Sequence, residues 1–392
     1  MLPANPCHSR VPARLLAGLA ALSLAGCGTL EGFLDNPSRP AHGETTEAAG
    51  ALPRAEPQSR NDFVLDDPQQ SVVGDLQVVI VGDGQTFSSL AREYGLGYDE
   101  LLAANPGVDP WIPAPGTAVL LPTQYVLPAT PRAGVVLNIA TKRLFYYPES
   151  PDGEPQPVLT YPIGIGRVGW ETPLGSTRVT AKARDPHWYV PTSVRQEHAE
   201  AGDPLPAVVP PGPDNPLGRY VLKLGLPGYL IHGTNQPYGV GMRVSHGCVR
   251  LYPENIEALY PLVGIDEQVT IVNQPHLLGV RGEQVYFESH APLEDNAVDT
   301  AQHLEALVTS AGDSGLIDGN PAAAAARMRA IASESLGVPV LLMRSDSDEI
   351  FDRALLVRNT VEADPDAPTL SEVRELLDAP VQPVAGDVEA VN

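Results

Sequence analysis

Short apolar runs separated by Gly and Pro make up the middle of the chain, between residues 132 and 273. Runs of this length, with β-branched and aromatic residues and frequent turns, are typical of strands in an all-β sandwich or barrel. One segment, Pro253–Tyr260, instead places Ile256 and Leu259 on one helical face behind an N-terminal proline. The pattern predicts a mainly β, sandwich-like domain over residues 132–273. Its expected strands are Val135–Ile139, Arg143–Tyr147, Val158–Ile163, Arg178–Ala183, Tyr220–Leu224, Leu230–His232 and Gln268–Val272.

A smaller unit with a different period precedes this domain, over residues 76–123. The predicted strand Leu76–Val81 is followed by Thr86, which can cap a helix whose apolar positions recur with helical spacing. A second helix is predicted from Tyr98, and a last strand ends at Pro122. The pattern therefore predicts a small α+β domain in the order strand, helix, helix, strand.

The N-terminus carries an apolar run that is too short to cross a bilayer. Two arginines precede Leu15–Ala25, which has eleven residues (25 − 15 + 1) and fits the apolar region of a secretory signal. The run ends on Leu24-Ala25-Gly26-Cys27, small residues before a cysteine. Residues 1–26 are therefore predicted to be a signal peptide. Residues 27–70, rich in Pro, Ala, Glu and Ser, are expected to be a flexible tether.

Residues 274–392 differ in composition from the rest. From Arg281 to the end the chain has 21 acidic and 7 basic residues, a net charge of 7 − 21 = −14. A last strand is predicted at Val285–Phe287, and helical tendency appears at Ala301–Leu307 and Ala322–Ala332. These features indicate a solvated acidic extension, partly helical or disordered, to which no chemistry is assigned.

The overall charge excludes some classes of partner. The formal net charge of −23 argues against nucleic-acid binding, which requires a basic surface. It also argues against direct electrostatic docking on anionic lipid. Membrane attachment would therefore have to come from the N-terminus.

Cysteine usage singles out one thiol. Cys7 would be removed with the signal peptide, and Cys27 would be blocked if it were lipidated. Cys248 would then remain as a lone thiol in an exported compartment, without a disulfide partner in the mature monomer. A lone cysteine can also be buried and inert, but a neighbouring glycine and two nearby histidines favour a reactive role.

The segment around Cys248 carries candidate nucleophilic chemistry. His232 lies 16 positions upstream (248 − 232), a spacing that suits two adjacent strands or loops. A thiol needs a base because the thiolate is the reactive species, so Cys248 is the candidate nucleophile and His232 the candidate proton acceptor and donor. The Gly233 carbonyl could orient His232, since no acidic residue is close in sequence. The backbone N–H groups of His246, Gly247 and Cys248 are candidate oxyanion donors.

Two further residues of the segment are candidate substrate contacts. If the segment is extended, Arg250 points away from Val249 and could bind a substrate carboxylate; a structural salt bridge is an equal alternative. Ser245 is assigned with Arg250 to substrate binding. The spacing of His232, His246 and Cys248 does not match usual zinc sites, so no metal or other cofactor is expected.

The motifs together resemble a known enzyme family. His232-Gly233-Thr234 followed by Ser245-His246-Gly247-Cys248-Val249-Arg250-Leu251 resembles the active-site signature of L,D-transpeptidases. The similarity extends upstream to Tyr161-Pro162-Ile163-Gly164 and Trp170-Glu171-Thr172-Pro173-Leu174-Gly175. The unit at 76–123 resembles a lysin motif (LysM), although it lacks the usual opening Tyr. The segment that ends at Cys27 resembles the lipobox of bacterial lipoproteins.

The resemblance implies a β-sandwich enzyme that acts on peptidoglycan. Cys248 would form a thioester with a tetrapeptide stem and release D-Ala, with His232, Gly233, His246 and Gly247 in the roles given above. The acceptor would be the side-chain amine of a second stem, giving a 3–3 cross-link, or of a wall-anchored lipoprotein. Carbapenem-type β-lactams would acylate Cys248. Lipidation of Cys27 would place the protein in the periplasm, anchored to the outer membrane.

Three alternatives remain open at this point. A hydrolase of the same family would use water as the acceptor and release D-Ala or wall-attached protein. A non-catalytic wall-binding lipoprotein would depend on the LysM-like unit alone. A general cysteine peptidase would cleave ordinary L-peptides. The choice of acceptor depends on the shape of the cleft and on water exclusion, which residue spacing does not reveal.

Overall fold

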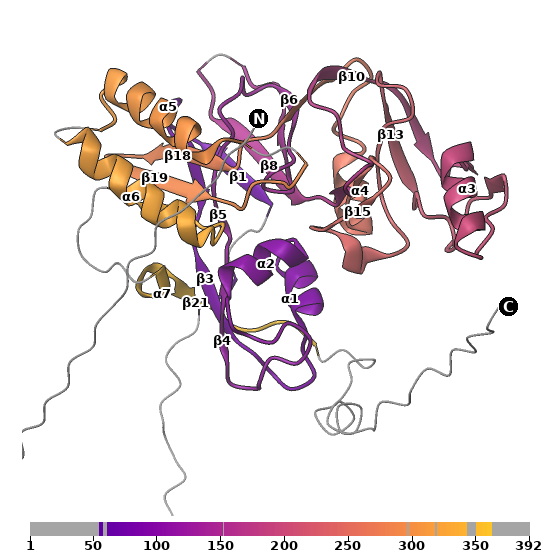
Figure 1. The fold of residues 1–392 in the computed structure, drawn as a ribbon, viewed down its shortest axis with the longest axis horizontal. Helices are drawn as coiled ribbons and strands as arrows, with labels where there is room; N and C mark the ends of the chain where they lie inside the picture. Colours follow the sequence, from indigo (N-terminus) through magenta and orange to yellow (C-terminus); the bar gives the residue numbers. More distant parts are fainter. Residues whose placement is uncertain are drawn as a thin grey trace, which may run out of the picture. The chain divides into compact units, whose positions relative to one another are not determined.

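The computed structural model describes residues 55–57, 61–151, 153–295, 298–317, 320–342 and 350–362. These residues lie within the unit Pro53–Asn392, while the predicted signal peptide and Cys27 lie outside the described residues. Nine strands form one sheet in the order β1-β8-β7-β6-β17-β10-β13-β14-β16 (Figure 1). The strands are β1 (Asp62–Leu65), β6 (Gly134–Asn138), β7 (Arg143–Tyr147), β8 (Gln156–Pro162), β10 (Gly175–Arg184), β13 (Tyr220–Leu224), β14 (Leu230–His232), β16 (Val249–Arg250) and β17 (Gln268–Val272).

Strand β10 is shared by two halves of this sheet. Its residues 175–178 pair antiparallel with β17, and residues 179–184 pair antiparallel with β13, with a shift of register between Val179 and Ala181. One buried cluster contains side chains from both halves, such as Leu137 from the first and Leu222 from the second. The prediction of a mainly β fold is confirmed, and a core shared by the two halves is what a sandwich requires.

Strand β7 shows why the apolar runs between residues 132 and 273 are continuous. All five of its residues are buried. Leu144 and Tyr146 belong to the cluster between the two halves, whereas Phe145 and Tyr147 belong to a second cluster on the other face. Because successive side chains of a strand point to opposite faces, a strand covered on both faces reads as an unbroken apolar run. The predicted bounds of β7, β13, β14 and β17 agree with the structure.

Short elements surround the end of the sheet that carries the His–Cys segment. Strands β9 and β15 pair in parallel, and β11 and β12 pair antiparallel. The helix predicted at Pro253–Tyr260 is confirmed as α4, whereas helix α3 was not predicted. The bounds are β9 (Ile165–Gly166), β11 (Trp188–Tyr189), α3 (Thr192–Glu200), β12 (Val208–Val209), the 3₁₀ helix η1 (Pro237–Gly239), β15 (Arg243–Ser245) and α4 (Pro253–Leu259).

The unit at 76–123 has the predicted order strand, helix, helix, strand. Thr86 caps the first helix, and its hydroxyl accepts a hydrogen bond from the Ser89 backbone N–H at 3.2 Å. A further strand pair, β2 with β5, flanks the unit. The bounds are β2 (Val72–Gly74), β3 (Gln77–Ile80), α1 (Phe87–Glu93), α2 (Tyr98–Ala104), β4 (Ala118–Leu121) and β5 (Gln124–Val126).

This unit packs directly on the nine-stranded sheet. Arg143 of β7 is 1% exposed and forms two hydrogen bonds to Glu100, at 2.9 and 2.8 Å. Gly97 lies against Gly241, so close that a Cβ on either glycine would come within 3 Å of the other's Cα. Breaking a buried ion pair from one side leaves an uncompensated charge, so the pair holds the unit and the sheet together.

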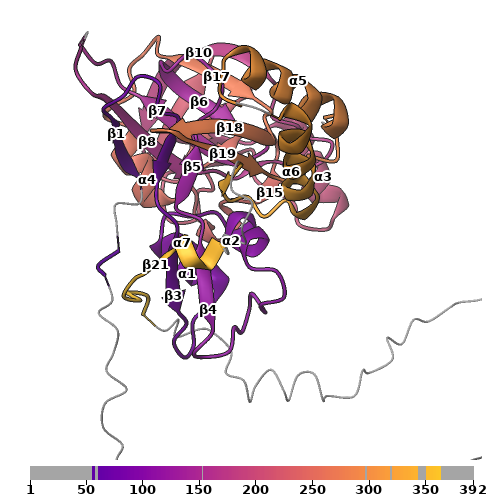
Figure 2. The same ribbon diagram turned by 90° about the vertical axis from the view of Figure 1, so that its left-hand side faces the viewer.

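The described residues after 273 are folded, so the expectation of a solvated extension is wrong for them, whereas the strand predicted at Val285–Phe287 and the helical segments predicted around 301–307 and 322–332 are present in β19, α5 and α6. Helices α5 and α6 lie beside strands β18 and β19 in both views (Figures 1 and 2). Their apolar faces form a buried cluster with Phe287 and Val340, whereas the acidic residues of the two helices, Glu305, Asp313 and Glu334, are exposed. The bounds are β18 (His276–Arg281), β19 (Gln284–Ser289), α5 (Thr300–Asp313), α6 (Pro321–Glu334), β20 (Val340–Leu341), α7 (Ile350–Arg353) and β21 (Leu355–Leu356).

Two segments at the ends of the described chain join sheets. Strand β21 pairs in parallel with β3, the first strand of the LysM-like unit, and so adds a strand to that unit. Strand β1 pairs antiparallel with β8, so the predicted tether does not extend to residue 70 as a free segment. The edge of β8 offers unpaired backbone groups that a short strand can satisfy, and the four residues of β1 are too few to give a clear periodic signal in the sequence.

Candidate active site

Parallel pairing of β14 with β16 brings the predicted nucleophile and base to one face. Ile231 is paired with Val249, and both side chains lie in the core. His232 ends β14 and Cys248 directly precedes β16, so this pairing brings the two residues near each other, and alternation of side chains directs both away from Ile231 and Val249. The residues that the sequence separates by 16 positions (248 − 232) therefore stand on neighbouring strands.

The ring of His232 is buried and held by backbone carbonyls. Nδ1 lies 2.6 Å from the Gly233 carbonyl oxygen, and the Leu217 carbonyl also faces the ring. Burial, reinforced by the charge of Arg250, lowers the pKa of His232 to about 3. The imidazole is therefore neutral at physiological pH. We assign the Nδ1 proton to the bond with Gly233, which leaves Nε2 as the basic nitrogen.

The Cys248 side chain is partly exposed just before β16. Its Sγ donates weakly to the Gly228 carbonyl at 3.6 Å. Burial raises the pKa of the Cys248 thiol above its usual value, while a backbone contact at Leu230 and the Arg250 charge act in the opposite direction. The resting group is a thiol, so attack on a carbonyl requires a base.

The turn before Cys248 needs glycine for two reasons. Gly247 has φ = 96°, a conformation that residues with a Cβ rarely adopt. A Cβ at this position would also lie 2.8 Å from the Tyr229 ring. The Gly247 carbonyl accepts a hydrogen bond from the Thr172 hydroxyl at 2.9 Å, and the same hydroxyl accepts one from the Gly166 N–H at 3.2 Å. These contacts hold the turn in one shape and leave its N–H groups as candidate oxyanion donors.

His246 lies in a different, charged environment. Its Nε2 is 3.1 Å from Glu197 Oε2 and 3.2 Å from Arg167 Nη2, and Glu197 also pairs with Arg167. The edge of the Trp170 ring is packed at 4.8 Å between centroids. Burial lowers the pKa of His246, and Glu197 opposes this effect. Because the imidazole is held by these side chains, any oxyanion contact from His246 comes from its backbone N–H.

Sequence reasoning did not find Glu197, Arg167 or the structural role of Thr172. Glu197 lies on α3, which has no strong apolar period, 49 residues from His246. No local pattern indicates a partner at that distance. Thr172 did leave a signal, since it belongs to the Trp170–Gly175 run that resembles the family.

Ser245 does not occupy a substrate-binding position. Its side chain is 1% exposed, and its hydroxyl donates a hydrogen bond to the Cys248 carbonyl oxygen at 2.5 Å. The assignment of Ser245 to substrate binding is therefore wrong. A buried hydroxyl that is satisfied by the backbone supports the turn instead.

Arg250 is a better candidate for substrate contact. Within the described ranges no ion pair involves it, and its buried Nε has no hydrogen-bond partner. Burial lowers the pKa of the guanidinium, although it stays charged at any physiological pH. These features favour a ligand carboxylate over the structural salt bridge that the sequence left open.

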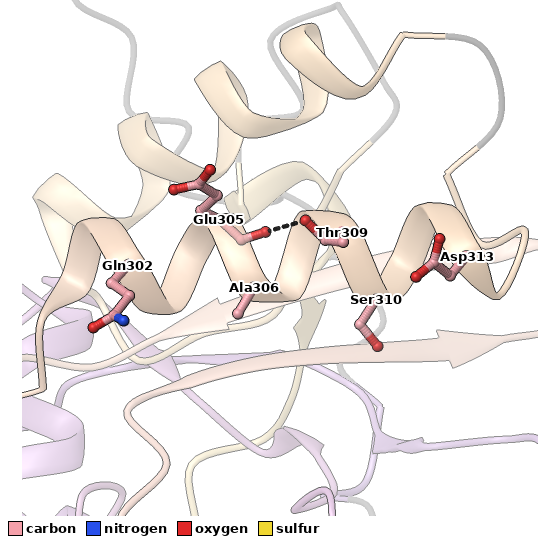
Figure 3. Close-up of a pocket in the computed structure, with 6 residues that line it drawn as sticks. All are labelled: Gln302, Glu305, Ala306, Thr309, Ser310 and Asp313. Atoms are coloured by element: carbon pink, nitrogen blue, oxygen red, sulfur yellow. Dashed lines mark hydrogen bonds between the residues drawn. The ribbon is translucent and has the colours of Figure 1, made fainter.

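Other sites were sought across the described part of the chain. No group of three or more His, Cys, Asp and Glu side chains there could hold a metal ion. No described helix is long and apolar enough to cross a membrane. The depression drawn in Figure 3 lies entirely along α5, where the Thr309 hydroxyl donates to the Glu305 carbonyl at 2.9 Å. None of its residues comes from the strands next to Cys248.

A thiol beside a neutral, carbonyl-oriented imidazole on a mainly β fold defines a candidate cysteine–histidine acyl-transfer site. Residues 132–271 match the YkuD L,D-transpeptidase catalytic domain. The chain is 38% identical over 269 residues to the probable L,D-transpeptidase YcfS of Escherichia coli K12, covering 67% of this chain and 83% of that protein. The chain therefore belongs to the L,D-transpeptidase family and is an L,D-transpeptidase enzyme.

Two further relatives carry the same family name. The probable L,D-transpeptidase YbiS of Escherichia coli K12 is 42% identical over 226 residues, covering 57% of this chain and 72% of that protein. The probable L,D-transpeptidase ErfK/SrfK of Salmonella typhimurium is 41% identical over 217 residues, covering 55% of this chain and 69% of that protein. The family resemblance of the His–Cys segment is thereby confirmed.

Proposed function

We propose that the protein is a peptidoglycan L,D-transpeptidase that acts through a thioester at Cys248. The observation that carries this proposal is the placement of Cys248 and His232 on one face of β14 and β16, with His232 Nδ1 2.6 Å from the Gly233 carbonyl. The neutral imidazole can accept the thiol proton at Nε2 without an acidic partner.

The first half-reaction forms the acyl-enzyme. Cys248 Sγ attacks the carbonyl carbon of the stem peptide, and its proton passes to His232. The oxyanion of the tetrahedral intermediate is stabilised by backbone N–H groups of the turn at Gly247. The carbon–nitrogen bond to the terminal D-Ala then breaks. The departing amine takes the proton from His232.

The second half-reaction transfers the acyl group. An acceptor amine attacks the thioester carbonyl and gives up a proton to His232. The carbon–sulfur bond breaks, the new amide leaves, and the proton returns to the thiolate. With water as the acceptor the same steps give hydrolysis. An amine from a second stem gives a cross-link, and an amine from a wall-anchored lipoprotein gives its attachment.

Incubation of the purified protein with tetrapeptide muropeptides tests the proposal. We expect release of D-Ala, a mass increase on Cys248, and dimers joined by a new amide. Cys248→Ala should form no adduct, and a carbapenem should label the wild-type protein alone. Shortened monomers without dimers would identify a hydrolase, while turnover of casein would favour a general cysteine peptidase.

The LysM-like unit and the N-terminus belong to the same proposal. The strand–helix–helix–strand order supports a glycan-binding role, and the buried Arg143–Glu100 pair supports a second role in steadying the sheet. Co-sedimentation of the Cys248→Ala variant with purified sacculi tests glycan binding without acylation. A lipid anchor at Cys27 would hold the enzyme in the periplasm, and mass spectrometry of the mature N-terminus tests it.

A further inference from the structure

Residues within and just after the His–Cys segment help to line a polar cleft of about 850 Å³. The rest of its lining comes from Asn61 before β1, from α1 of the LysM-like unit and Gly95 after it, and from the last described residues, 360–362. Tyr252 and Asn255 line the cleft and follow β16 directly, so they are close in sequence to Cys248. Tyr238, on η1, also lines the cleft and lies within Coulombic reach of Arg250.

The rim of the cleft is acidic and built from contacts between these parts. Arg92 of α1 forms two hydrogen bonds to Glu254 of α4, at 2.9 and 3.0 Å. Glu93 accepts a hydrogen bond from the Thr360 hydroxyl at 2.8 Å. Glu362 adds a third carboxylate to the lining. The lining carries the carboxylates of Glu93, Glu254 and Glu362 and the guanidinium of Arg92, and a lining rich in carboxylates favours a cationic ligand over an anionic one.

One lining side chain lacks a partner in a way that itself indicates a ligand. Asn255 is 6% exposed, and its Nδ2 has no hydrogen-bond partner in the described part of the chain. An amide nitrogen that is buried without a partner costs free energy, and buried polar groups are nearly always paired in native proteins. A carbonyl oxygen of a bound peptide would satisfy this donor.

We propose that this cleft binds the acyl acceptor, a peptide that carries a side-chain primary amine. Its backbone carbonyl would accept from Asn255, its ammonium would be drawn to the carboxylates, and exposed Tyr238 would form a wall on the side of Arg250. The inference rests on the proposed transpeptidase function. It adds where the acceptor binds, and it gives the LysM-like unit and residues 360–362 a share in that site.

The partition of one thioester between two products tests the acceptor cleft. A tetrapeptide stem serves as the donor, and a dansyl-labelled peptide with one lysine serves as the acceptor below its KM. Amide and hydrolysis products come from the same acyl-enzyme, so their ratio reports on the acceptor alone. We expect Asn255→Leu and Tyr238→Ala each to lower the amide-to-hydrolysis ratio about two- to tenfold, the range of one lost hydrogen bond or contact.

A charge variant and a matched control complete the design. Glu362→Gln should lower the ratio up to about fivefold, with the effect fading in high salt, as for an exposed charge. Glu305→Gln removes an exposed carboxylate on α5, outside the cleft, and should leave the ratio unchanged. Tyr238 is 61% exposed, so its variant folds even if Asn255→Leu does not.

The outcomes separate the two proposals. Unchanged ratios in the Asn255 and Tyr238 variants would overturn the acceptor cleft while leaving the enzyme proposal intact. Competition by chitotetraose that Asn255→Leu abolishes would make the cleft a glycan site and also overturn it. If the wild-type protein releases no D-Ala and gains no mass at Cys248, the transpeptidase proposal itself fails.

Discussion

The two histidines of the His–Cys segment are held in opposite ways. His232 is 3% exposed, and its Nδ1 lies 2.6 Å from the Gly233 backbone carbonyl oxygen. His246 is partly exposed and is held by the side chains of Glu197 and Arg167. A backbone partner cannot be lost by substitution and carries no full charge, so it orients a base while leaving it neutral. Side-chain partners tie His246 to a separate helix, and that connection can be altered by mutation.

The largest effect is expected at the buried histidine. His232→Ala removes the proposed base and should lower the rate of thioester formation about 10² to 10⁴-fold. The rate can be followed as a mass increase on Cys248 with a carbapenem. Cys248→Ala is the zero-rate control, and circular dichroism confirms that each variant is folded. A His232→Ala enzyme with nearly full activity would remove the distinction between the two histidines.

The turn at Gly247, directly before Cys248, should be almost as sensitive. Gly247→Ala places a Cβ against Tyr229 and strains a backbone at φ = 96°. If this moves the oxyanion donors, acylation should fall about 10² to 10³-fold. Combining it with Tyr229→Ala relieves the contact but leaves the backbone strain, so recovery should be partial. Full recovery would show that only the contact mattered.

A smaller effect is expected at His246, the histidine that contacts charged side chains. Glu197→Gln keeps a hydrogen-bonding side chain but removes the charge that faces His246 and Arg167. Glu197 is 39% exposed, so solvent screens the interaction, and acylation should fall only about two- to fivefold. If Glu197 positions His246 through its charge, the acylation rate of the wild-type enzyme should depend on salt, whereas the rate of the Glu197→Gln variant should not. A loss as large as that of His232→Ala would contradict this ranking.

The smallest change concerns pH. A neutral base with a pKa of about 3 should keep acylation nearly constant between pH 7 and pH 5. A histidine with its ordinary pKa near 6.5 would lose about 30-fold over the same range. A 30-fold fall in the carbapenem acylation rate would assign an ordinary pKa to the base.

Unlike the acylation rate, the stability of the fold is expected to depend on pH in this range, so it must be measured alongside the rate. The unfolded chain binds a proton at His232 below about pH 6.5, whereas the folded chain does not until about pH 3. This group therefore contributes its full stability above the unfolded pKa, and stability falls as pH drops from there towards 3. Thermal unfolding at each pH separates loss of fold from loss of base.

Much of the fold was predictable because the signals are local. β7, β13, β14 and β17 have the predicted bounds, and α4 begins at its proline. Strand β1 was missed because its four residues are too few to show a period, and helix α3 because most of its residues are exposed and show no apolar period. The helical tendency of α5 and α6 was predicted, but their packing was not, because net charge reports the surface whereas these helices bury a narrow apolar face.

The sequence by itself determined the candidate chemistry of this protein: a thiol at Cys248, a histidine 16 positions upstream (248 − 232), and glycines where the backbone needs them. These depend on residue type and short-range geometry. Tertiary structure alone decided that Ser245 supports the turn, that Glu197 reaches His246, and that a cleft forms from segments far apart in the chain. Such contacts arise when strands pair and helices pack. Their partners are set by the whole fold and not by their neighbours in the chain.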